Sequence, residues 1–502
     1  MEPSQDHRRW ARTKIVATVG PASSSPEMLA ALARAGVDVF RLNMAHGDPA
    51  KGQVLLDRIR KVSSDEGRAL AVLVDLAGPK IRLGEVADGG MLCELGATFF
   101  LVAGEPQAPN EFNATYEPLL RELSAGDVAM FADGTVAMRV EEASPERARM
   151  VVTQQGWVRS RQGINLPGVK LSAPALGEHD RENAAWAARA GADYISLSFV
   201  RRPEDVRELK ELIRSSGGEA AVIAKIEKRE ALELLEEIIA AADGVMVARG
   251  DLGVEIDVAR MPLEQKRIIR VSQELQKPTI IATQMLESMH ESPRPTRAET
   301  TDVANAILDG ADACMLSGET AIGKFPRDAV EMMNRIARAT EESMAGRPPR
   351  EMTRPTADNL QDVTRAVVRG AGTMAHVLAA KLVVVASHSG RTALALSQQR
   401  SFVPTIGVSD RPETLRKMCL YWGVTPLGGA PATRPQQLIR YIDRWACAEG
   451  LARKGDRIVV VGGSHLAAGP RGELETSGVH DIVIVHQIEG ASLEPPRDDA
   501  HG

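Results

Sequence analysis

The sequence predicts an α/β protein organised around a closed (β/α)8 barrel, with a small β-barrel lid domain inserted into it and an open α/β domain after it. Eight short β-rich runs alternate with segments of helical periodicity along the first two-thirds of the 502 residues. One gap between these runs is much longer than the others, and the alternation restarts after Pro348 and Pro349. Alternating βα units form parallel sheets, and eight of them close into a TIM barrel of about 250 residues.

The eight runs follow one another at the spacing of a βα unit, except at the long gap. They lie at residues 13–18, 37–43, 69–76, 193–199, 220–227, 243–248, 278–283 and 312–318. Helical segments such as PEMLAALARAG lie between most of them, and many end in a Gly-Ala-Asp or Ala-Asp-Gly turn. We therefore assign residues 13–83 and 163–347 to the barrel, after an N-terminal arm of residues 1–12.

The long gap lies between Leu76 and Tyr194. Within it, residues 84–162 contain turns and short β-prone runs (ATFFLVAG, DVAMFADG, TVAMRV and ARMVVTQQGW). An insertion after the third strand lies at the catalytic end of a barrel, where a closing lid would be useful. We predict a small all-β lid domain there.

The C-terminal part repeats the α/β pattern. A helix-like stretch, DVTRAVVRGAGTMAHVLAA, leads to the strand-like runs KLVVVAS, PTIGVSD, GVTPLG, DRIVVVGG and HDIVIVHQ. We assign residues 348–489 to an open, mostly parallel α/β domain. Residues 490–502 are expected to form a tail without fixed structure.

The composition argues against several functional classes. Hydrophobic residues make up 44% and charged residues 25%, which is ordinary for a globular protein. A net charge of −6 with only 3% aromatics is unfavourable for nucleic-acid binding. No run has the ~20 apolar residues of a membrane span, and the first residues lack the apolar core of a secretory signal. Scattered cysteines without a CxxC motif favour reduced thiols, so we expect a cytoplasmic protein with no nucleic-acid or membrane partner.

Polar side chains cluster where the predicted barrel strands end, which is the catalytic face of such barrels. Lys225 and Glu227 are two residues apart on one strand, so both project to the same face. Asp251 follows the next strand, and two carboxylates would leave waters and substrate oxygens to complete the octahedron of Mg²⁺ (or Mn²⁺). With the backbone amide of Gly250, this set suits a phosphorylated carboxylic acid. An ordinary structural ion pair between Lys225 and a carboxylate is the alternative.

These residues lie in segments that resemble one family over almost the whole chain. The segments are TKIVATVGPAS, RLNMAHG, GPKIRLG, INLPG, AKIE, MVARGDLGVEI, IIATQMLESM, PTRAETTDVANAILDGAD and MLSGET. In this order they resemble the pyruvate kinases. The resemblance implies phosphoryl transfer from phosphoenolpyruvate to ADP, giving pyruvate and ATP at the last step of glycolysis, with Mg²⁺ as cofactor.

The resemblance also implies roles for individual residues. Lys225 matches the catalytic lysine that contacts the transferring phosphoryl group and the enolate oxygen, and Arg41 matches the arginine that binds the same group. Glu227 and Asp251 match the Mg²⁺ ligands. Thr283 matches the threonine linked to protonation of the enolate carbon, a step in which a hydroxyl needs a water relay.

Further matches complete the expected substrate and nucleotide sites. The amides of Gly250 and Asp251 would hold the substrate carboxylate, beside Ser198 and Phe199. The nucleotide-binding positions are Asn43, His46, Arg82 and Asp133, with Ser317 and Glu319 also near the nucleotide and metal. Asp133 fits an ordinary Asp-Gly hairpin turn almost as well.

Two departures from the family pattern change what we expect. The family often has a lysine immediately before the Gly-Ile-Asn-Leu-Pro-Gly segment, where this chain has Gln162. Arg161 would substitute for it, or nucleotide affinity would be lower. Potassium-requiring members have a serine in place of Ala45 and a glutamate in place of Lys80. We therefore expect Lys80, beside Asn43 and Asp75, to replace K⁺ in an enzyme that does not need it, whereas a merely exposed Lys80 is the alternative.

The C-terminal domain contains a candidate phosphate loop directly after a strand and before a helix. It consists of Ser387, His388, Ser389, Gly390, Arg391 and Thr392. Hydroxyls and a glycine at a helix N-terminus can bind a phosphate through backbone amides and the helix dipole, although such turns are also ordinary helix caps. The loop matches the family's allosteric sugar-phosphate site, and the family analogy implies a homotetramer.

Two other functions are compatible with parts of the sequence. A metal-dependent barrel lyase acting on phosphoenolpyruvate or an oxoacid would use the same lysine and carboxylates without a nucleotide. The inserted domain and Arg82 argue against it. A catalytically silent metabolite sensor would use only the C-terminal loop, and the joint presence of Arg41, Lys225, Glu227, Asp251 and Thr283 argues against that.

Overall fold

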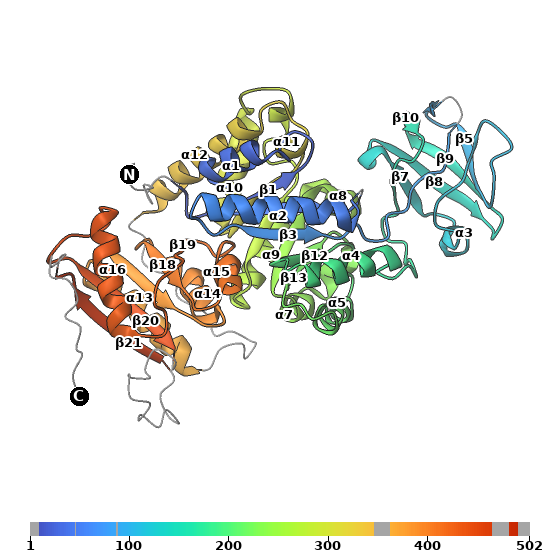
Figure 1. Cartoon of the computed structure of the whole chain (residues 1–502). Coiled ribbons are helices and arrows are strands. Elements are labelled where there is room, and N and C mark those ends of the chain that lie inside the picture. Colours follow the sequence, from blue (N-terminus) through green and yellow to red (C-terminus); the bar gives the residue numbers. More distant parts are fainter. Residues whose placement is uncertain (1–9, 46, 87–88, 346–361, 464–480, 490–502) are drawn as a thin grey trace.

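A computed structural model describes residues 10–45, 47–86, 89–345, 362–463 and 481–489. The barrel occupies the middle of the molecule, with the inserted domain on one side and the C-terminal domain on the other (Figure 1). The predicted fold class is confirmed. The proposed tail and the first nine residues of the arm lie outside the described residues. No helix in the described ranges combines the length and apolarity needed to cross a membrane.

Each of the eight predicted runs supplies one strand of a closed barrel whose neighbouring pairs are parallel. In chain order the strands are β1 (Lys14–Val19), β2 (Val39–Asn43), β3 (Ala71–Asp75), β12 (Tyr194–Leu197), β13 (Ala221–Ile226), β14 (Gly244–Ala248), β15 (Thr279–Ala282) and β16 (Ala313–Leu316). Their residues are almost all buried, as expected for a parallel sheet covered on both faces.

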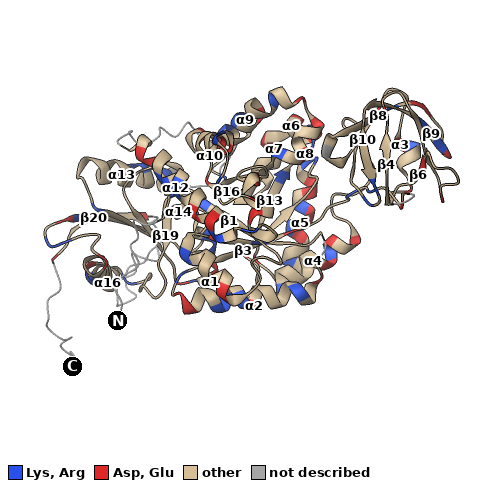
Figure 2. Cartoon of the chain, turned by 90° about the horizontal axis from the view of Figure 1, so that it is seen from above, with Lys and Arg blue, Asp and Glu red and all other residues tan. Residues whose placement is uncertain are grey.

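Amphipathic helices surround the strands and present their charged faces outwards. The main ones are α1 (Pro26–Ala35), α2 (Pro49–Asp65), α4 (Glu178–Arg189), α5 (Pro203–Ser215), α7 (Leu235–Ala241), α9 (Met261–Glu274), α10 (Arg297–Asp309) and α12 (Pro326–Met344). Local sequence defines several of their starts: Ser25, Asp48 and Thr296 cap α1, α2 and α10 through side-chain oxygens. Acidic and basic residues are interspersed along these outer helices (Figure 2).

Four aspartates make the same contact at the N-terminal ends of the strands. One carboxylate oxygen of each aspartate accepts a hydrogen bond from a backbone N–H of the preceding strand, with N···O distances of 2.8–3.0 Å. Each binds a cationic side chain with the other oxygen; the pairs are Asp38 with Arg68, Asp193 with Arg416, Asp243 with Lys210 and Asp312 with Arg400. These are the aspartates of the Gly-Ala-Asp and Ala-Asp-Gly turns and of Gly-Val-Asp at Asp38, so the repeated turn closes the lower rim of the barrel.

The inserted domain consists of two sheets around one apolar core. The larger sheet has six strands in the order β11 (Ile164–Asn165), β7 (Val128–Phe131), β8 (Val136–Ala143), β9 (Arg147–Gln154), β5 (Thr98–Val102) and β6 (Glu111–Phe112). The smaller sheet consists of β10 (Gly156–Arg159) paired with β4 (Gly90–Cys93). The expected β-barrel is therefore two sheets rather than one continuous closed ladder. Its core also includes Ile81, Leu83, Leu166 and Val169, so it extends past the expected limits of 84 and 162.

The C-terminal domain has a five-stranded sheet in the order β19 (Val424–Pro426), β18 (Thr405–Val408), β17 (Leu382–Ala386), β20 (Arg457–Gly463), β21 (Asp481–Gln487). Only β21 is antiparallel. The helices are α13 (Asp362–Val377), α14 (Arg391–Gln398), α15 (Pro412–Met418) and α16 (Pro435–Ala448). The domain lies against the lower rim of the barrel, where its Arg400 and Arg416 bind Asp312 and Asp193.

Candidate active site

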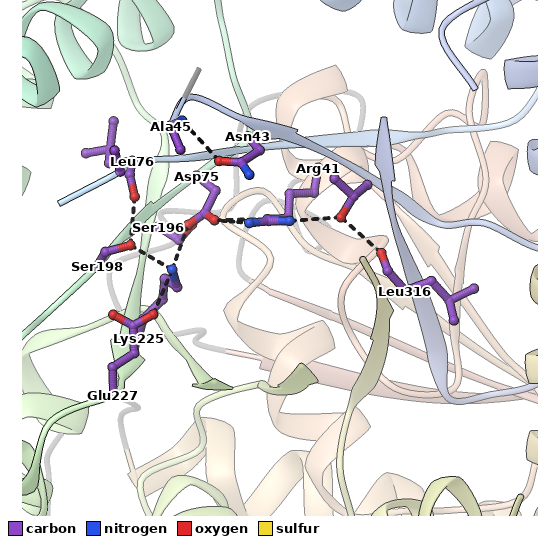
Figure 3. A network of polar contacts seen from close by, with 12 residues as sticks. Arg41, Asn43, Ala45, Asp75, Leu76, Ser196, Ser198, Lys225, Glu227 and Leu316 are labelled. Carbon is purple, nitrogen blue, oxygen red and sulfur yellow. Dashed lines mark hydrogen bonds and ion pairs between the residues drawn. The ribbon is translucent and has the colours of Figure 1, made fainter. Parts of the chain in front are cut away.

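Asp75 lies at the centre of a polar network at the upper, C-terminal end of the barrel (Figure 3). It ends β3, whose register with β2 pairs Asp75 with Asn43, so Arg41 lies two residues before the directly paired position. Arg41 donates from Nε to Asp75 Oδ2 at 2.9 Å, and Nη2 contacts the same oxygen. Arg41 Nη1 donates to Thr18 Oγ1 at 3.0 Å. The guanidinium is thereby held at both ends.

Lys225 contacts the same aspartate from β13. Its Nζ lies 3.5 Å from Asp75 Oδ1, 2.8 Å from Glu227 Oε1 and 2.7 Å from Ser198 Oγ. Ser198 donates in turn to the Leu76 carbonyl at 2.7 Å. The structure thus brings together the predicted residues Arg41, Asp75, Ser198, Lys225 and Glu227 in one connected network (Figure 3).

Opposite charges hold Asp75 and Lys225 ionised despite their burial. Burial alone would raise the pKa of Asp75, but the charges of Lys225 and Arg41 outweigh it and lower the pKa below its ordinary value. Burial alone would lower the pKa of Lys225, but Asp75 and Glu227 raise it. Two fixed cations therefore face the mouth of the barrel, which is the charge that a phosphorylated anion requires.

Glu227 and Asp251 form a pair of neighbouring carboxylates. Glu227 is only 1% exposed, and its Oε2 accepts the Phe199 N–H at 2.7 Å. Burial and the nearby charge of Asp251 raise the pKa of Glu227 although Lys225 lies beside it. Within the described ranges, no group of three or more acidic, histidine or cysteine side chains is placed to hold a metal. Two adjacent carboxylates that repel each other fit Mg²⁺, which is often bound by one or two carboxylates together with substrate oxygens.

Thr283 lies after β15 and faces the start of α8 (Arg249–Glu255). Its Oγ1 accepts the Gly250 N–H at 2.8 Å. Both Thr283 and Gln284 have positive φ angles, 66° and 55°. Two successive non-glycine residues in this region are uncommon, and for a β-branched threonine it is a clear outlier. The Gly250 amide assigned to the substrate carboxylate is thus engaged by Thr283.

Some predicted residues lie away from this network. Lys80 is exposed, and within the described residues no hydrogen bond or ion pair joins it to Asn43 or Asp75. Arg82 is on the hinge of the inserted domain and donates to the Arg161 carbonyl at 3.2 Å, while Arg161 pairs with Glu85. Gln162, beside Arg161, accepts the Arg159 N–H at 2.8 Å.

The remaining predicted nucleotide positions are placed differently. Glu319 is buried and accepts the N–H groups of Leu286 and Ser317 at 3.1 and 2.7 Å, so it joins the loops after β15 and β16. Asp133 lies in the short helix η2 (Ala132–Gly134), but its side chain is not among those described. His46 lies outside the described residues.

The predicted phosphate loop connects β17 to α14. Gly390 has a φ of 81°, which glycine adopts readily, and its N–H donates to Ser387 Oγ at 3.0 Å. His388 Nδ1 lies 2.9 Å from Asp410 Oδ1 on the neighbouring loop. His388, Ser389 and Arg391 are exposed. The local geometry is that of a turn at a helix N-terminus, open to solvent.

Two residues of the site, Thr18 and Ser196, were not selected from the sequence, and Arg249 was noted at a strand end without a role. Thr18 contacts Arg41, Ser196 donates to Asp75 Oδ1, and Arg249 binds the backbone of Thr283. Ser196 and Ser198 stand two apart in a buried run, so their shared face was a usable signal. Arg249 precedes the Gly-Asp pair at a strand end, but nothing in the sequence identifies Thr283 as its partner.

The fold and this network define a protein of the (β/α)8 class whose upper rim carries two fixed cations beside a pair of carboxylates. Comparison with known proteins identifies the family. The family models described as "Pyruvate kinase, barrel domain" and "Pyruvate kinase, alpha/beta domain" match residues 10–330 and 365–480.

Curated relatives agree with this match. A pyruvate kinase of Mycobacterium intracellulare is 40% identical over 95% of this chain and 98% of its own. A pyruvate kinase of Methylorubrum extorquens is 41% identical over 91% of this chain and 95% of its own. A pyruvate kinase of Staphylococcus epidermidis is 36% identical over 94% of this chain and 80% of its own. The chain belongs to the pyruvate kinase family, whose members are phosphotransferases.

Proposed function

We propose that this enzyme transfers the phosphoryl group of phosphoenolpyruvate to ADP in a Mg²⁺-dependent reaction that yields pyruvate and ATP. The observation that supports this most directly is the network in which Asp75 holds Arg41 and Lys225 together beside the Glu227–Asp251 pair. It supplies two cations for the phosphoryl group and two carboxylates for a metal within one buried site. Such positioning and charge neutralisation are what phosphoryl transfer requires of a protein.

Glu227 and Asp251 would hold the Mg²⁺ (or Mn²⁺). A bound divalent cation would neutralise charge on the phosphoryl and enolate oxygens. Lys225 and Arg41 would contact the same phosphoryl group from the other side, kept in place by Asp75 and Ser198. The inserted domain, joined through the segments around Arg82 and Gly163, would close over the site and exclude water that would hydrolyse the donor.

Thr283 would take part in protonation of the enolate carbon. Its hydroxyl accepts the Gly250 N–H, so its own hydrogen remains available for another partner. Binding of the substrate carboxylate to the Gly250 amide would compete with this contact and release the hydroxyl. A water relay would supply the proton, because a hydroxyl is too weak an acid to supply it alone.

We further propose that the enzyme does not need K⁺. The oxygens expected around a monovalent ion already have donors: Asn43 Oδ1 accepts the Ala45 N–H at 3.1 Å, and the Leu76 carbonyl accepts from Ser198. Asp75 is shared by Arg41, Lys225 and Ser196. Lys80, exposed near the hinge, would add the positive charge that the family otherwise takes from the ion.

The test is pyruvate formation from phosphoenolpyruvate and ADP with Mg²⁺, with tetramethylammonium as the only monovalent cation. We expect activity there that added K⁺ leaves unchanged. Activity that appears only with K⁺ would keep the kinase and reject the cation proposal. Pyruvate formed without ADP would instead indicate a lyase or hydrolase. Lys80→Glu should make the activity depend on K⁺, whereas the same charge change at exposed Lys170 should not.

We also propose how the enzyme is regulated and how its chains assemble. The loop from Ser387 to Thr392 would bind a phosphorylated effector, through exposed His388 and Arg391 and the start of α14. The exposed apolar side chains of Val258, Leu263 and Ile322 on the barrel support burial against other copies in a homotetramer. Light scattering tests the assembly, and activity titrations with sugar phosphates, repeated on Arg391→Ala, test the loop.

A further inference from the structure

The backbone after β15 adopts an unusual conformation at Thr283, the residue proposed to take part in proton transfer. Thr283 and Gln284 both have left-handed φ angles, 66° and 55°. L-residues rarely adopt this region, and a β-branched side chain makes it less favourable still. Such a conformation persists only where surrounding contacts enforce it, and such residues cluster at functional sites.

One arginine side chain supplies those contacts. Arg249 Nη2 donates to the Thr283 carbonyl at 2.6 Å and to the Gln284 carbonyl at 3.1 Å, and Nε donates to the Thr283 carbonyl at 3.2 Å. Both carbonyls of the left-handed pair therefore converge on one guanidinium. This convergence requires the turn, because an extended backbone would direct successive carbonyls to opposite sides.

The guanidinium is itself held rigidly. Arg249 is only 8% exposed, and its Nη1 binds Asp302 Oδ2 on α10 at 2.5 Å. The Met285 sulfur lies 2.8 Å from Nη2. A planar guanidinium with fixed contacts on several sides defines both the position and the angle of the carbonyls that it binds.

Arg249 and its chain neighbour contact Thr283 at opposite ends. The guanidinium binds the Thr283 carbonyl, and the N–H of Gly250 binds the Thr283 hydroxyl at 2.8 Å. We propose that Arg249 is a positioning residue for the proton-transfer half of the reaction, holding Thr283 so that its hydroxyl faces the substrate carbon. This proposal rests on the proposed function and assigns a role to a residue that does not itself touch the substrate.

The step that Arg249 assists is protonation of the enolate carbon, and solvent supplies the proton. The enolate double bond supplies the electron pair for a new C–H bond at the methylene carbon, and the enolate oxygen becomes the ketone carbonyl. The Thr283 hydroxyl gives its proton to that carbon and receives one from solvent through the water relay. The threonine is unchanged, and the medium supplies one proton.

The reverse of this step can be measured without phosphoryl transfer. Pyruvate in D₂O with the wild-type enzyme, Mg²⁺ and inorganic phosphate should exchange its methyl hydrogens, which NMR follows directly. We expect Arg249→Lys to slow this exchange at least 10-fold while changing the KM for phosphoenolpyruvate less than twofold. The control is Arg400→Lys, another nearly buried arginine that binds one carboxylate and one carbonyl, but at the lower rim.

A double-mutant comparison separates positioning from general damage. If Arg249 acts through Thr283, Arg249→Lys should slow exchange no further in a Thr283→Ala enzyme. Equal slowing in both backgrounds, or exchange unaffected by Arg249→Lys, would overturn the proposal. Should Arg249→Lys not fold, Asp302→Asn replaces it, because the partly exposed Asp302 anchors the guanidinium and its loss should slow exchange by a smaller factor. A wild-type enzyme that forms no pyruvate would reject the proposed function instead.

Discussion

The two rims of the barrel use charged residues in opposite ways. At the lower rim, four aspartates each bind a strand N–H and a cation, so every carboxylate oxygen named there has a donor. At the upper rim, Glu227 lies buried beside the like charge of Asp251, and Phe199, Thr283 and Gln284 have left-handed φ angles. The carboxylates compared at the lower rim are thus paired with cations, whereas the upper rim places two like charges side by side and two successive residues, Thr283 and Gln284, in the left-handed region.

This difference shows how one scaffold separates stability from function. Paired and hydrogen-bonded carboxylates at the lower rim close the barrel and dock the C-terminal domain. The unfavourable groups at the upper rim persist because the rigid strands hold them in place, and ligands would relieve them. Changes at the upper rim should therefore alter activity more than stability, and changes at the lower rim should do the reverse.

The largest expected effect is at Lys225. Lys225→Met keeps the length of the side chain but removes the charge beside Asp75 and Glu227. We expect pyruvate formation to fall by at least about 10³-fold, because a charge aimed at the reacting group contributes on this scale. A steady-state assay and thermal unfolding by circular dichroism check this. Activity above about one-hundredth of wild type would contradict the assigned role.

The next effect is in stability, at the lower rim. Asp312→Ala leaves Arg400, Gln398 and the Thr279 N–H without their buried partner. We expect the free energy of unfolding to fall by about 3–5 kcal/mol, the usual cost of breaking a buried ion pair. Urea unfolding measures it, and KM and kcat of the folded fraction should stay within about twofold of wild type.

The control for this change is Asp243→Ala. Asp243 makes the same strand contact but is 39% exposed and pairs with Lys210 on the surface. We expect a loss of about 1 kcal/mol there, because water screens exposed pairs. Equal losses at Asp312 and Asp243 would show that burial is not what makes the lower-rim contacts strong.

Acid pH should reveal the contribution of Asp75. Its pKa lies below the ordinary 3.8 because Lys225 and Arg41 outweigh the effect of burial. A carboxyl group whose pKa is lower in the folded state stabilises that state at any pH above its pKa in the unfolded chain. This contribution is lost as the pH falls through the pKa that the group has in the folded state. The difference in unfolding free energy between wild type and Asp75→Asn should be constant from pH 5 to 7 and shrink below about pH 4. A difference that persists unchanged to pH 2.5 would contradict this.

The smallest expected effect is a change in stability that reports the backbone strain at Gln284. Gln284→Gly keeps the backbone carbonyl that Arg249 binds and removes an exposed side chain from a residue with a φ of 55°. Because glycine adopts this conformation readily, the free energy of unfolding should rise by about 1 kcal/mol. Urea unfolding tests it. A loss of stability would mean that the left-handed turn is not under strain.

The sequence alone was enough to define the fold and much of the site. The length of the β-rich runs, the distance between them and the helical periodicity of the intervening segments predicted all eight barrel strands. This works because buried parallel strands are short apolar runs that follow one another at the nearly constant length of a βα unit. Placement at the ends of those strands predicted that Arg41, Asp75, Lys225 and Glu227 would meet, since a closed parallel barrel collects all its strand ends at one rim. The repeated Gly-Ala-Asp turn was visible, but its function as a strand contact was not.

Tertiary structure decided which of these groups touch and what each contact does. Arg249 and Thr283 are 34 residues apart, and Ser196 lies 121 residues from Asp75, so only the closed barrel shows that they are paired. It also places Arg41 and Lys225, rather than exposed Lys80, against Asp75. Sequence patterns record burial and local geometry, whereas hydrogen bonds between side chains on different strands depend on barrel closure and register, which no local pattern contains.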